Sequence, residues 1–494
     1  MKKSLAVTLV ALFVLAVSFA MVPKKANAIP AFAQKYHFSC AVCHTVFPNL
    51  NPFGRAFWRN GFRLPGTNGT PADATQIANG LSLPNPWPIP IVLEAQVFYQ
   101  HVTNENVLPV KGSKKTDSFN VKDNLVVGGA TKLYTPLADS LSFYANYGET
   151  NGSGLTGSVW ASLNGIGSGF GLAPHLFNLK LGNITTASPY FYRQAPFSGG
   201  FTEGPTINGQ GLNVGMDGEA GLLIHSQNAG IALYGTPGYH LWYKVTMTND
   251  AGSAANTPAS QPNSSGGYTN TASNAMEYSY QLKEYLPTSA GQLEFGYYGA
   301  SIAEPINYSS YIITTNPLGV ASTPTSGSFT DGIQVNGVDL DLANDVYELG
   351  LTYMEQHDSN PYGGIFNGTS YHNTNGYNTF EVYGRYLFPT LLGHGAMLVA
   401  DFSTYSWEHK QTEEEYNQIV AADNGGTSLT CANGNLYESG TYASGSCNTN
   451  EGIKDAFDIF GDLNLAYNAH LYAGYIFTNK SQDNMFRTGL YFAF

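Results

Sequence analysis

Charged side chains are scarce in this sequence. Asp, Glu, Lys and Arg together make up 12% of the residues, about half of the usual quarter. Aromatic side chains are not scarce, because the chain holds 33 Tyr and 28 Phe, and this abundance argues against an intrinsically disordered protein. Few charges, many aromatic residues and long uncharged polar stretches favour an exported β-protein.

Long apolar runs are missing from all but the first 28 residues. There, two lysines precede an apolar run over 5–22, and Ala-Asn-Ala at 26–28 supplies a small-x-small cleavage site. This pattern predicts a secretory signal peptide over 1–28, with an uncleaved membrane anchor as the alternative. No later stretch of the sequence reaches 18 apolar residues, so no transmembrane helix is expected after it.

Cysteine is also rare, with four in the whole chain. Cys431 and Cys447 flank a stretch that is too polar for a core. In an exported protein, such a pair predicts a disulfide within a loop, and two free surface thiols are the alternative. The other two cysteines, Cys40 and Cys43, belong to a motif near the N-terminus.

Acidic residues are absent from 29–66, although the chain as a whole carries a net charge of −13. The stretch 67–88 is rich in turn-forming residues and is interpreted as a linker. We therefore expect a small domain with its linker over 29–85 and a second domain over 86–494. No basic stripe follows the first domain, which argues against nucleic acid, and no Ser/His/Asp set, phosphate-binding loop or zinc-ligand spacing stands out.

The second domain alternates apolar and polar residues with a period of two. In 275–286, for example, one set of alternate residues is largely apolar and the other is polar; the sets are Met276, Tyr278, Tyr280, Leu282 and Glu277, Ser279, Gln281, Lys283. Such alternation predicts strands with one polar and one apolar face. A soluble β-sandwich would show the same alternation.

Three features favour a transmembrane barrel over a sandwich. The segments are about 10–13 residues long, aromatic residues gather at their ends, and short turns alternate with long polar loops. The chain also ends on alternating aromatic residues and Phe494. We therefore predict a mainly β protein, an antiparallel transmembrane barrel of about sixteen strands, at 90–102, 122–134, 140–149, 157–168, 174–184, 213–226, 238–249, 274–286, 291–302, 329–342, 346–357, 377–388, 395–408, 455–467, 470–480 and 485–494.

The N-terminal motif reads Cys40-x-x-Cys43-His44. In an exported chain this spacing predicts covalent attachment of one haem c, with two thioether bonds and His44 as the proximal iron ligand. A disulfide between Cys40 and Cys43, beside an incidental His, is the alternative. The second axial ligand is not evident. His37 is one candidate. The others are an open site or a residue of the barrel wall, such as Met216, Met247, His101 or His240.

A short helix is expected after the motif. Over 51–63, Arg55, Arg59 and Arg63 recur every four residues and so share one face, while Phe53 and Phe57 share another. We expect the phenylalanines to pack on the haem and the arginines to bind its propionates. A solvated basic face is the alternative.

So small a domain makes a marginal core for a haem, and a sixteen-strand barrel has an aqueous lumen. We therefore expect the haem domain to plug the barrel or to cap its periplasmic mouth.

The stretch 29–66, "IPAFAQKY…CAVCHTVFPNLNPFGRAFWRNGFRLPG", resembles the N-terminal motif of the fused monohaem cytochrome–porins, which are bacterial outer-membrane iron oxidases. The resemblance carries over Cys40, Cys43 and His44 as haem residues, and Pro48, Phe53, Gly54 and Arg55 without an assigned role. His37 stands where the family is not expected to have His.

The resemblance implies a location in the outer membrane, surrounded by its lipid, and oxidation of extracellular Fe(II). The electron would pass to a periplasmic c-type cytochrome or cupredoxin. The basic haem domain suits an acidic carrier of this kind. The acidic run at 413–415 could attract Fe(II) or be a solvated loop. Two alternatives remain: the same architecture with another electron donor, and a diffusion porin with a haem plug.

Overall fold

The computed structural model describes residues 42–46, 49–63, 74–78, 81–84, 91–102, 116–133, 135–150, 156–185, 227–238, 240–249, 268–270, 276–309, 326–359, 374–391, 394–408, 455–466, 469–478 and 484–493. The predicted signal peptide, the predicted disulfide and the terminal Phe494 lie outside these residues. So do His37, Cys40 and the acidic run at 413–415.

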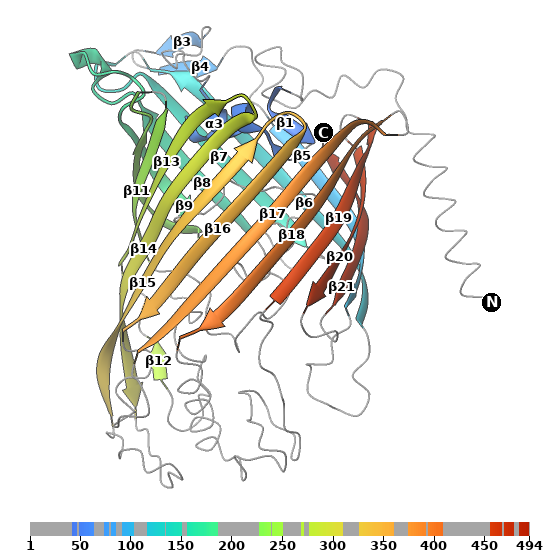
Figure 1. Ribbon diagram of the computed structural model, residues 1–494. Helices are drawn as coiled ribbons and strands as arrows, with labels where there is room; N and C mark the ends of the chain where they lie inside the picture. Colours follow the sequence, from blue (N-terminus) through green and yellow to red (C-terminus); the bar gives the residue numbers. More distant parts are fainter. Residues whose placement is uncertain are drawn as a thin grey trace, which may run out of the picture.

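Sixteen of the described strands form one closed antiparallel barrel (Figure 1). Strands that follow one another along the chain pair with each other, and the first and last barrel strands, β5 and β21, pair to close the wall. The predicted mainly β fold and its antiparallel barrel of about sixteen strands are thereby confirmed for the described chain, and the haem domain stays a prediction. The wall strands are β5 (Ile91–Val102), β6 (Thr116–Lys132), β7 (Ser140–Thr150), β8 (Thr156–Asn164), β9 (Asn178–Thr185), β10 (Gln227–Gly235), β11 (Leu241–Asn249), β13 (Met276–Thr288), β14 (Gly291–Ser309), β15 (Ser326–Ala343), β16 (Tyr347–Asp358), β17 (Asn375–Leu391), β18 (His394–Trp407), β19 (Asp455–Ala466), β20 (Ala469–Thr478) and β21 (Met485–Ala493).

The barrel is apolar outside and polar inside. On β13, Tyr278 and Leu282 are 55% and 42% exposed, whereas Glu277 and Lys283 are 1% and 0% exposed. The same division runs along the other strands, where outward Leu, Val, Ile and Phe alternate with buried polar residues. A membrane-spanning barrel needs this arrangement, because its outer face contacts hydrocarbon. The backbone groups of such a barrel are all paired within the wall. None of the helices among the described residues is long and apolar enough to cross a membrane.

Short turns gather at one end of the barrel, which we call the short-turn end. The connections β6–β7, β13–β14 and β15–β16 lie there, and β5 begins and β21 ends there. The β15–β16 turn forms because the side-chain oxygen of Asn344 accepts hydrogen bonds from the backbone N–H groups of Val346 and Tyr347, both at 2.8 Å. Short turns at one end are the arrangement expected of a bacterial barrel, whose turns face the periplasm.

One strand lies elsewhere than predicted. The predicted strand 213–226 is outside the described residues, and the wall position between β9 and β11 is occupied by β10. The alternation in β10 is weak, because Gly and Ala fill several of its positions; only Ile231 and Leu233 present large apolar side chains outward. At Gly230, a Cβ atom would lie 2.3 Å from the Met247 carbonyl oxygen, so close pairing explains the missing side chain.

The stretch interpreted as a linker also contains structure. β3 (Ala74–Ala78) and β4 (Leu81–Pro84) form a two-stranded antiparallel sheet, and β4 lies beside β6. A second short element, β12 (Tyr268–Asn270), pairs with the far part of β14. In Figure 1 the β3–β4 hairpin lies at the short-turn end, above the wall.

The segment 42–46 and 49–63, which we call the plug, lies within the barrel at the short-turn end (Figure 1). It consists of β1 (His44–Val46), β2 (Asn49–Leu50) and α3 (Pro52–Arg59). The helix lies within the expected range 51–63. It begins at Pro52, where the Asn51 side chain accepts a hydrogen bond from the Gly54 N–H at 2.9 Å and Pro52 occupies the first helical position.

Candidate functional site

The second half of the Cys-x-x-Cys-His motif packs directly on the start of α3. The backbone N–H of Asn51 donates to the Cys43 carbonyl at 2.9 Å, and the Asn51 side chain donates to the Val42 carbonyl at 3.0 Å. A Cβ atom at Gly54 would lie 2.1 Å from the same Cys43 oxygen. The motif and the helix can therefore touch only because position 54 is Gly, and His44 follows at once as the first residue of β1.

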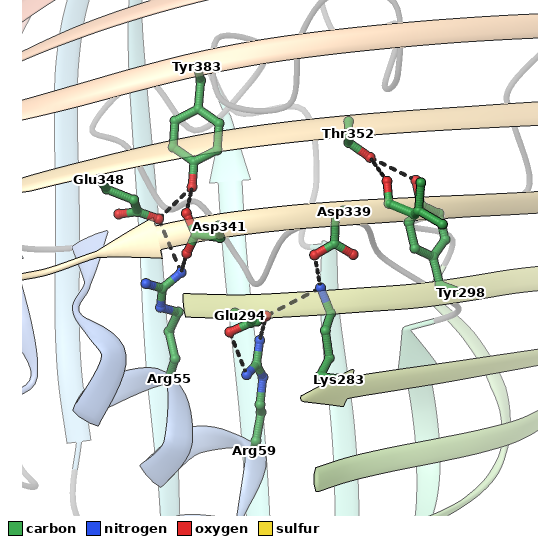
Figure 2. A network of polar contacts seen from close by, with 11 residues as sticks. Arg55, Arg59, Lys283, Glu294, Tyr298, Asp339, Asp341, Glu348, Thr352 and Tyr383 are labelled. Carbon is green, nitrogen blue, oxygen red and sulfur yellow. Dashed lines mark hydrogen bonds and ion pairs between the residues drawn. The ribbon is translucent and has the colours of Figure 1, made fainter. Parts of the chain in front are cut away.

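Two arginines of the predicted basic face reach the inner wall. Arg55 Nη1 lies 2.6 Å from Asp341 Oδ2 on β15 and 3.1 Å from Glu348 Oε1 on β16 (Figure 2). The Tyr383 hydroxyl on β17 donates to both carboxylates, at 2.7 Å to Asp341 and 2.5 Å to Glu348. Arg385 pairs with the other Glu348 oxygen. Arg55 thus binds carboxylates of two wall strands, and β17 contributes further partners to the same carboxylates.

Arg59, one turn further along α3, makes a bidentate ion pair. Its Nη2 and Nη1 atoms lie 2.7 and 3.1 Å from the two carboxylate oxygens of Glu294 on β14. Lys283 Nζ on β13 lies 3.3 Å from Glu294 Oε1 and also bonds Asp339 on β15. The Arg59 guanidinium is 5.1 Å from the ring centre of Tyr285, a cation–π distance.

These contacts form two charge-balanced groups, one around Arg55 and one around Arg59, and we call the two together the ion network. It holds four cations and four carboxylates, all buried: Arg55, Arg59, Lys283 and Arg385 with Glu294, Asp339, Asp341 and Glu348. The alternative of a solvated basic face is therefore wrong, because Arg55 and Arg59 are each 4% exposed. The described contacts of both guanidiniums are with the wall, and the predicted contact with haem propionates remains a prediction.

The surroundings set the pKa values of the two arginines in opposite directions. Burial alone lowers the pKa of Arg55, but the negative charges of Asp341 and Glu294 outweigh it and raise that pKa. For Arg59 burial dominates over the attraction of Glu294, and the pKa is lowered. Arginine stays protonated in proteins in either case, so the positive charge of Arg55 and Arg59 is constant over the physiological pH range.

The end of the plug is fixed by aromatic packing. Phe62 stacks on Trp160 of β8, with ring centres 5.6 Å apart and planes 14° apart, and Phe57 packs against the same cluster. Lys180 Nζ lies 4.0 Å from the centre of the Trp160 ring and 5.3 Å from that of Trp58 on the helix. The plug is therefore held on two sides of the barrel, by charges at one and by rings at the other.

Arg63, the third arginine of the predicted face, lies beyond the end of α3. It is 1% exposed and donates to the Asn60 carbonyl at 2.9 Å and to the Asn178 side chain at 2.8 Å. The chain turns there through left-handed backbone at Gly61 and Phe62. Arg63 therefore fixes this turn against β9 and is not part of the ion network. Phe53, the predicted haem contact, is half-buried on α3.

Two of the wall residues considered as haem ligands point away from the lumen. Met247 is 38% exposed on the outer face of β11. His101 belongs to the outward set of β5, where its Nδ1 lies 2.6 Å from Asp117 Oδ1. Neither can reach a group held inside the barrel. His240 is exposed in the β10–β11 turn, and Met216 lies outside the described residues.

The wall carboxylates that hold the plug were not singled out from the sequence. Glu294, Asp341 and Glu348 look like ordinary polar positions of alternating strands, and their partners on the plug lie more than 230 positions away. The one available signal is that acidic residues recur on alternating β14–β16 positions while the plug holds only basic ones. In the described part of the chain, no group of three or more His, Cys, Asp or Glu is placed to hold a metal ion.

Comparisons with known proteins give likeness in structure alone. No family model and no curated protein matches the sequence. Among solved structures, a mutant of the Rh. blastica porin aligns with 82% of this chain and 100% of its own, at 11% identity and a TM-score of 0.41. Pseudomonas putida OprB aligns with 82% of this chain and 94% of its own, at 9% identity and 0.46. A loop-deletion mutant of OmpT, an outer membrane protein of Vibrio cholerae, aligns with 82% and 99%, at 8% and 0.43.

Proposed function

We propose that this protein is an outer-membrane electron-transfer protein. It oxidises Fe(II) outside the cell and passes the electron, through one covalently attached haem c, to a periplasmic c-type cytochrome or cupredoxin. One observation carries the proposal: Cys43 and His44, the second half of the Cys-x-x-Cys-His motif, adjoin a helix that lies inside the barrel and is fastened to its inner wall.

The residues at the motif fit a haem c. Cys40 and Cys43 supply the two thiols for its thioether bonds, and His44 supplies the axial imidazole. The Cys43 carbonyl is fixed on α3 by Asn51 and by the close approach of Gly54, so the second thiol and the imidazole start from a rigid backbone. When bound, the haem supplies a one-electron carrier at this position.

The chain separates the electron from the iron. Each Fe(II) gives up one electron and leaves as Fe(III) on the outer side, and the periplasmic carrier takes up one electron on the inner side. The ion network and the ring cluster keep the plug at the short-turn end, so the path through the protein ends at the mouth where a periplasmic carrier can dock. No bond of the protein is made or broken.

The location follows from the wall. An apolar outer face on a closed antiparallel barrel requires a membrane, and bacterial barrels of this even-numbered kind belong to the outer membrane. The predicted signal peptide supplies export. The long polar connections would then face the outside of the cell, where Fe(II) is the donor, and the short turns the periplasm.

A haem-plugged diffusion porin is the second candidate. The observation in its favour is the strand number, because sixteen-strand barrels ordinarily enclose an aqueous channel. The two functions lead to different expectations for ion conductance and for electron exchange. A diffusion porin conducts ions regardless of the redox state, whereas the proposed electron-transfer protein exchanges electrons with Fe(II) whether or not ions pass.

The test is stopped-flow visible spectroscopy of the purified protein in detergent, mixed with Fe(II) at acidic and at neutral pH. We expect the α-band of reduced haem c to rise quickly and to saturate. The variant C40A/C43A should lose the band, whereas the matched double variant C431A/C447A, which removes the other two cysteines, should keep it. A haem that dithionite reduces and Fe(II) does not, at either pH, would contradict iron as the donor.

A further inference from the structure

One sector of the rim at the short-turn end exposes large apolar side chains. Leu137 in the β6–β7 turn is 59% exposed, and Phe170 and Leu172 in the β8–β9 connection are 77% and 46% exposed. The β13–β14 turn at the same end exposes Thr288 and Ser289 instead. We call the β6–β7 turn and the β8–β9 connection together the apolar rim.

The two parts of the apolar rim are joined into one unit. The Gly167 N–H donates to the Leu137 carbonyl at 3.0 Å. A Cβ atom at Gly169 would lie 2.5 Å from the Pro136 carbonyl oxygen, so the short helix η2 (Ser168–Phe170) lies directly on the β6–β7 turn. Left-handed glycines flank η2 on both sides and allow the tight path of the chain. The exposed apolar side chains are therefore held on a fixed backbone.

The β8–β9 connection runs along the outer side of the rim. The Tyr243 hydroxyl, on the outer face of β11, donates to the Leu176 carbonyl at 2.7 Å, and the same oxygen leaves no room for a Cβ atom at Gly235, an outward position of β10. The next outward residues of these two strands, Leu233 and Val245, are 40% and 52% exposed. In Figure 1 the connection, drawn in teal, projects beyond the edge of the wall at the short-turn end. The apolar rim therefore continues the lipid-facing surface past the ends of the strands.

The β8–β9 connection is also suited to leave water. The stretch 165–177 contains no Asp, Glu, Lys or Arg, and its one histidine, His175, is half-buried. The N–H groups of Phe170, Gly171 and Leu172 donate to carbonyl groups within the connection. An uncharged segment whose donors are already paired loses little when it enters an apolar environment.

An exposed apolar patch of this kind marks either a protein partner or a membrane. Continuity with the lipid-facing surface of β10 and β11 favours the membrane, and the short turns of such a barrel face the periplasm. We propose that the apolar rim inserts into the periplasmic leaflet of the outer membrane, among the acyl chains of its phospholipids. This inference goes beyond the proposed function, because it needs neither haem nor iron. The inserted rim fixes the depth at which the mouth that holds the plug lies in the bilayer.

The test places a tryptophan in the apolar rim and measures its contact with lipid. The full-length protein with Phe170→Trp is reconstituted in nanodiscs of phosphatidylethanolamine and phosphatidylglycerol, with and without bromine on the acyl chains. Because the chain already holds five Trp, each variant is evaluated as its difference from the unchanged protein. We expect the added emission to be shifted to short wavelength, strongly quenched by brominated chains and little affected by iodide.

Two matched variants give the limits of this measurement. Leu181→Trp, on the outer face of β9 and 45% exposed in the unchanged protein, should be quenched by brominated chains. Ser289→Trp, in the exposed β13–β14 turn, should be quenched by iodide. A response of Phe170→Trp like that of Ser289→Trp would overturn the proposal. Protection from both quenchers would overturn it as well, because the rim would then be covered by protein.

A second measurement needs no substitution. The unchanged protein is placed in nanodiscs that contain a phospholipid with a photoreactive diazirine on its acyl chain, close to the glycerol, and the labelled peptides are identified by mass spectrometry. We expect label within 165–177 in addition to the strands, whereas label on the strands alone would contradict insertion. Both measurements can be made without Fe(II) and on protein with or without haem, so a failure of the proposed function does not change their outcome.

Discussion

Arg59 of the plug and Glu294 of the wall face each other with both carboxylate oxygens engaged, although 235 positions separate them in the sequence. Both side chains are almost wholly buried. A buried pair of this kind is costly to break, because the partner left behind is an uncompensated charge. The ion pair therefore fixes the plug against the barrel wall.

Replacing Glu294 with Gln should loosen the plug. We expect a loss of about 3–5 kcal/mol of stability and a rise in ion conductance through the barrel. Thermal unfolding in detergent and single-channel recording in planar bilayers measure the two effects. The matched control is Glu284→Gln, which changes an exposed glutamate on the neighbouring strand β13, next to Lys283. A conductance equal to that of this control would contradict the role of the ion network.

Replacing Tyr383 with Phe should cost about 1–3 kcal/mol. The hydroxyl donates to Asp341 and Glu348, and both buried carboxylates would lose that donor. The midpoint of guanidinium unfolding, followed by intrinsic fluorescence, measures the loss. Tyr386→Phe, on the outer face of the same strand and 46% exposed, should leave the midpoint unchanged; equal midpoints for the two variants would show that the hydroxyl is not needed.

Replacing Gly54 with Ala should separate the haem motif from α3. The added Cβ atom would lie 2.1 Å from the Cys43 carbonyl oxygen, and overpacking of this kind costs about 1–3 kcal/mol. We expect a lower ratio of covalent haem to protein than in the unchanged chain. At Gly461 the nearest atom to an added Cβ is 3.9 Å away, so Gly461→Ala should load normally. Normal loading of both variants would argue against this packing as a requirement.

Replacing Phe62 with Ala should release the end of the plug from the wall. Phe62 is 3% exposed and stacked on Trp160, and removal of a buried phenylalanine ring costs about 3–5 kcal/mol. Thermal unfolding measures the loss, and Phe62→Leu should recover part of it. Phe119→Ala, which removes a ring that is 79% exposed on the outer face of β6, is the comparison; a similar melting temperature for both alanine variants would contradict the anchoring role.

The barrel was predictable because its signal is local. In β13, the alternation of apolar and polar neighbours shows which face of the strand each residue occupies. Tyr278 and Lys283 could therefore be assigned to opposite faces, as the structure confirms. The same logic failed for β10, whose Gly and Ala positions weaken the alternation. The β3–β4 hairpin was also not predicted, because the prolines and glycines around it favoured a linker.

The site was predictable only in part. The Arg55 and Arg59 spacing correctly indicated one helical face, and the helix lies within the expected range 51–63. The partners of that face could not be read, because an aspartate on β15 gives no local sign that it will meet an arginine 286 positions earlier. Such pairings depend on how the wall closes, which is a property of the whole fold.

The contacts of the plug also have a consequence for the order of folding. Wall hairpins join neighbours in sequence and form early, whereas contacts across long sequence separations form slowly, since large loops must close first. The plug is the first described part of the chain, yet its charged partners belong to β14, β15 and β16. The plug therefore has no charged wall partners until the middle of the chain has been exported. Any chemical modification of its cysteines can be completed before the plug is bound to the wall.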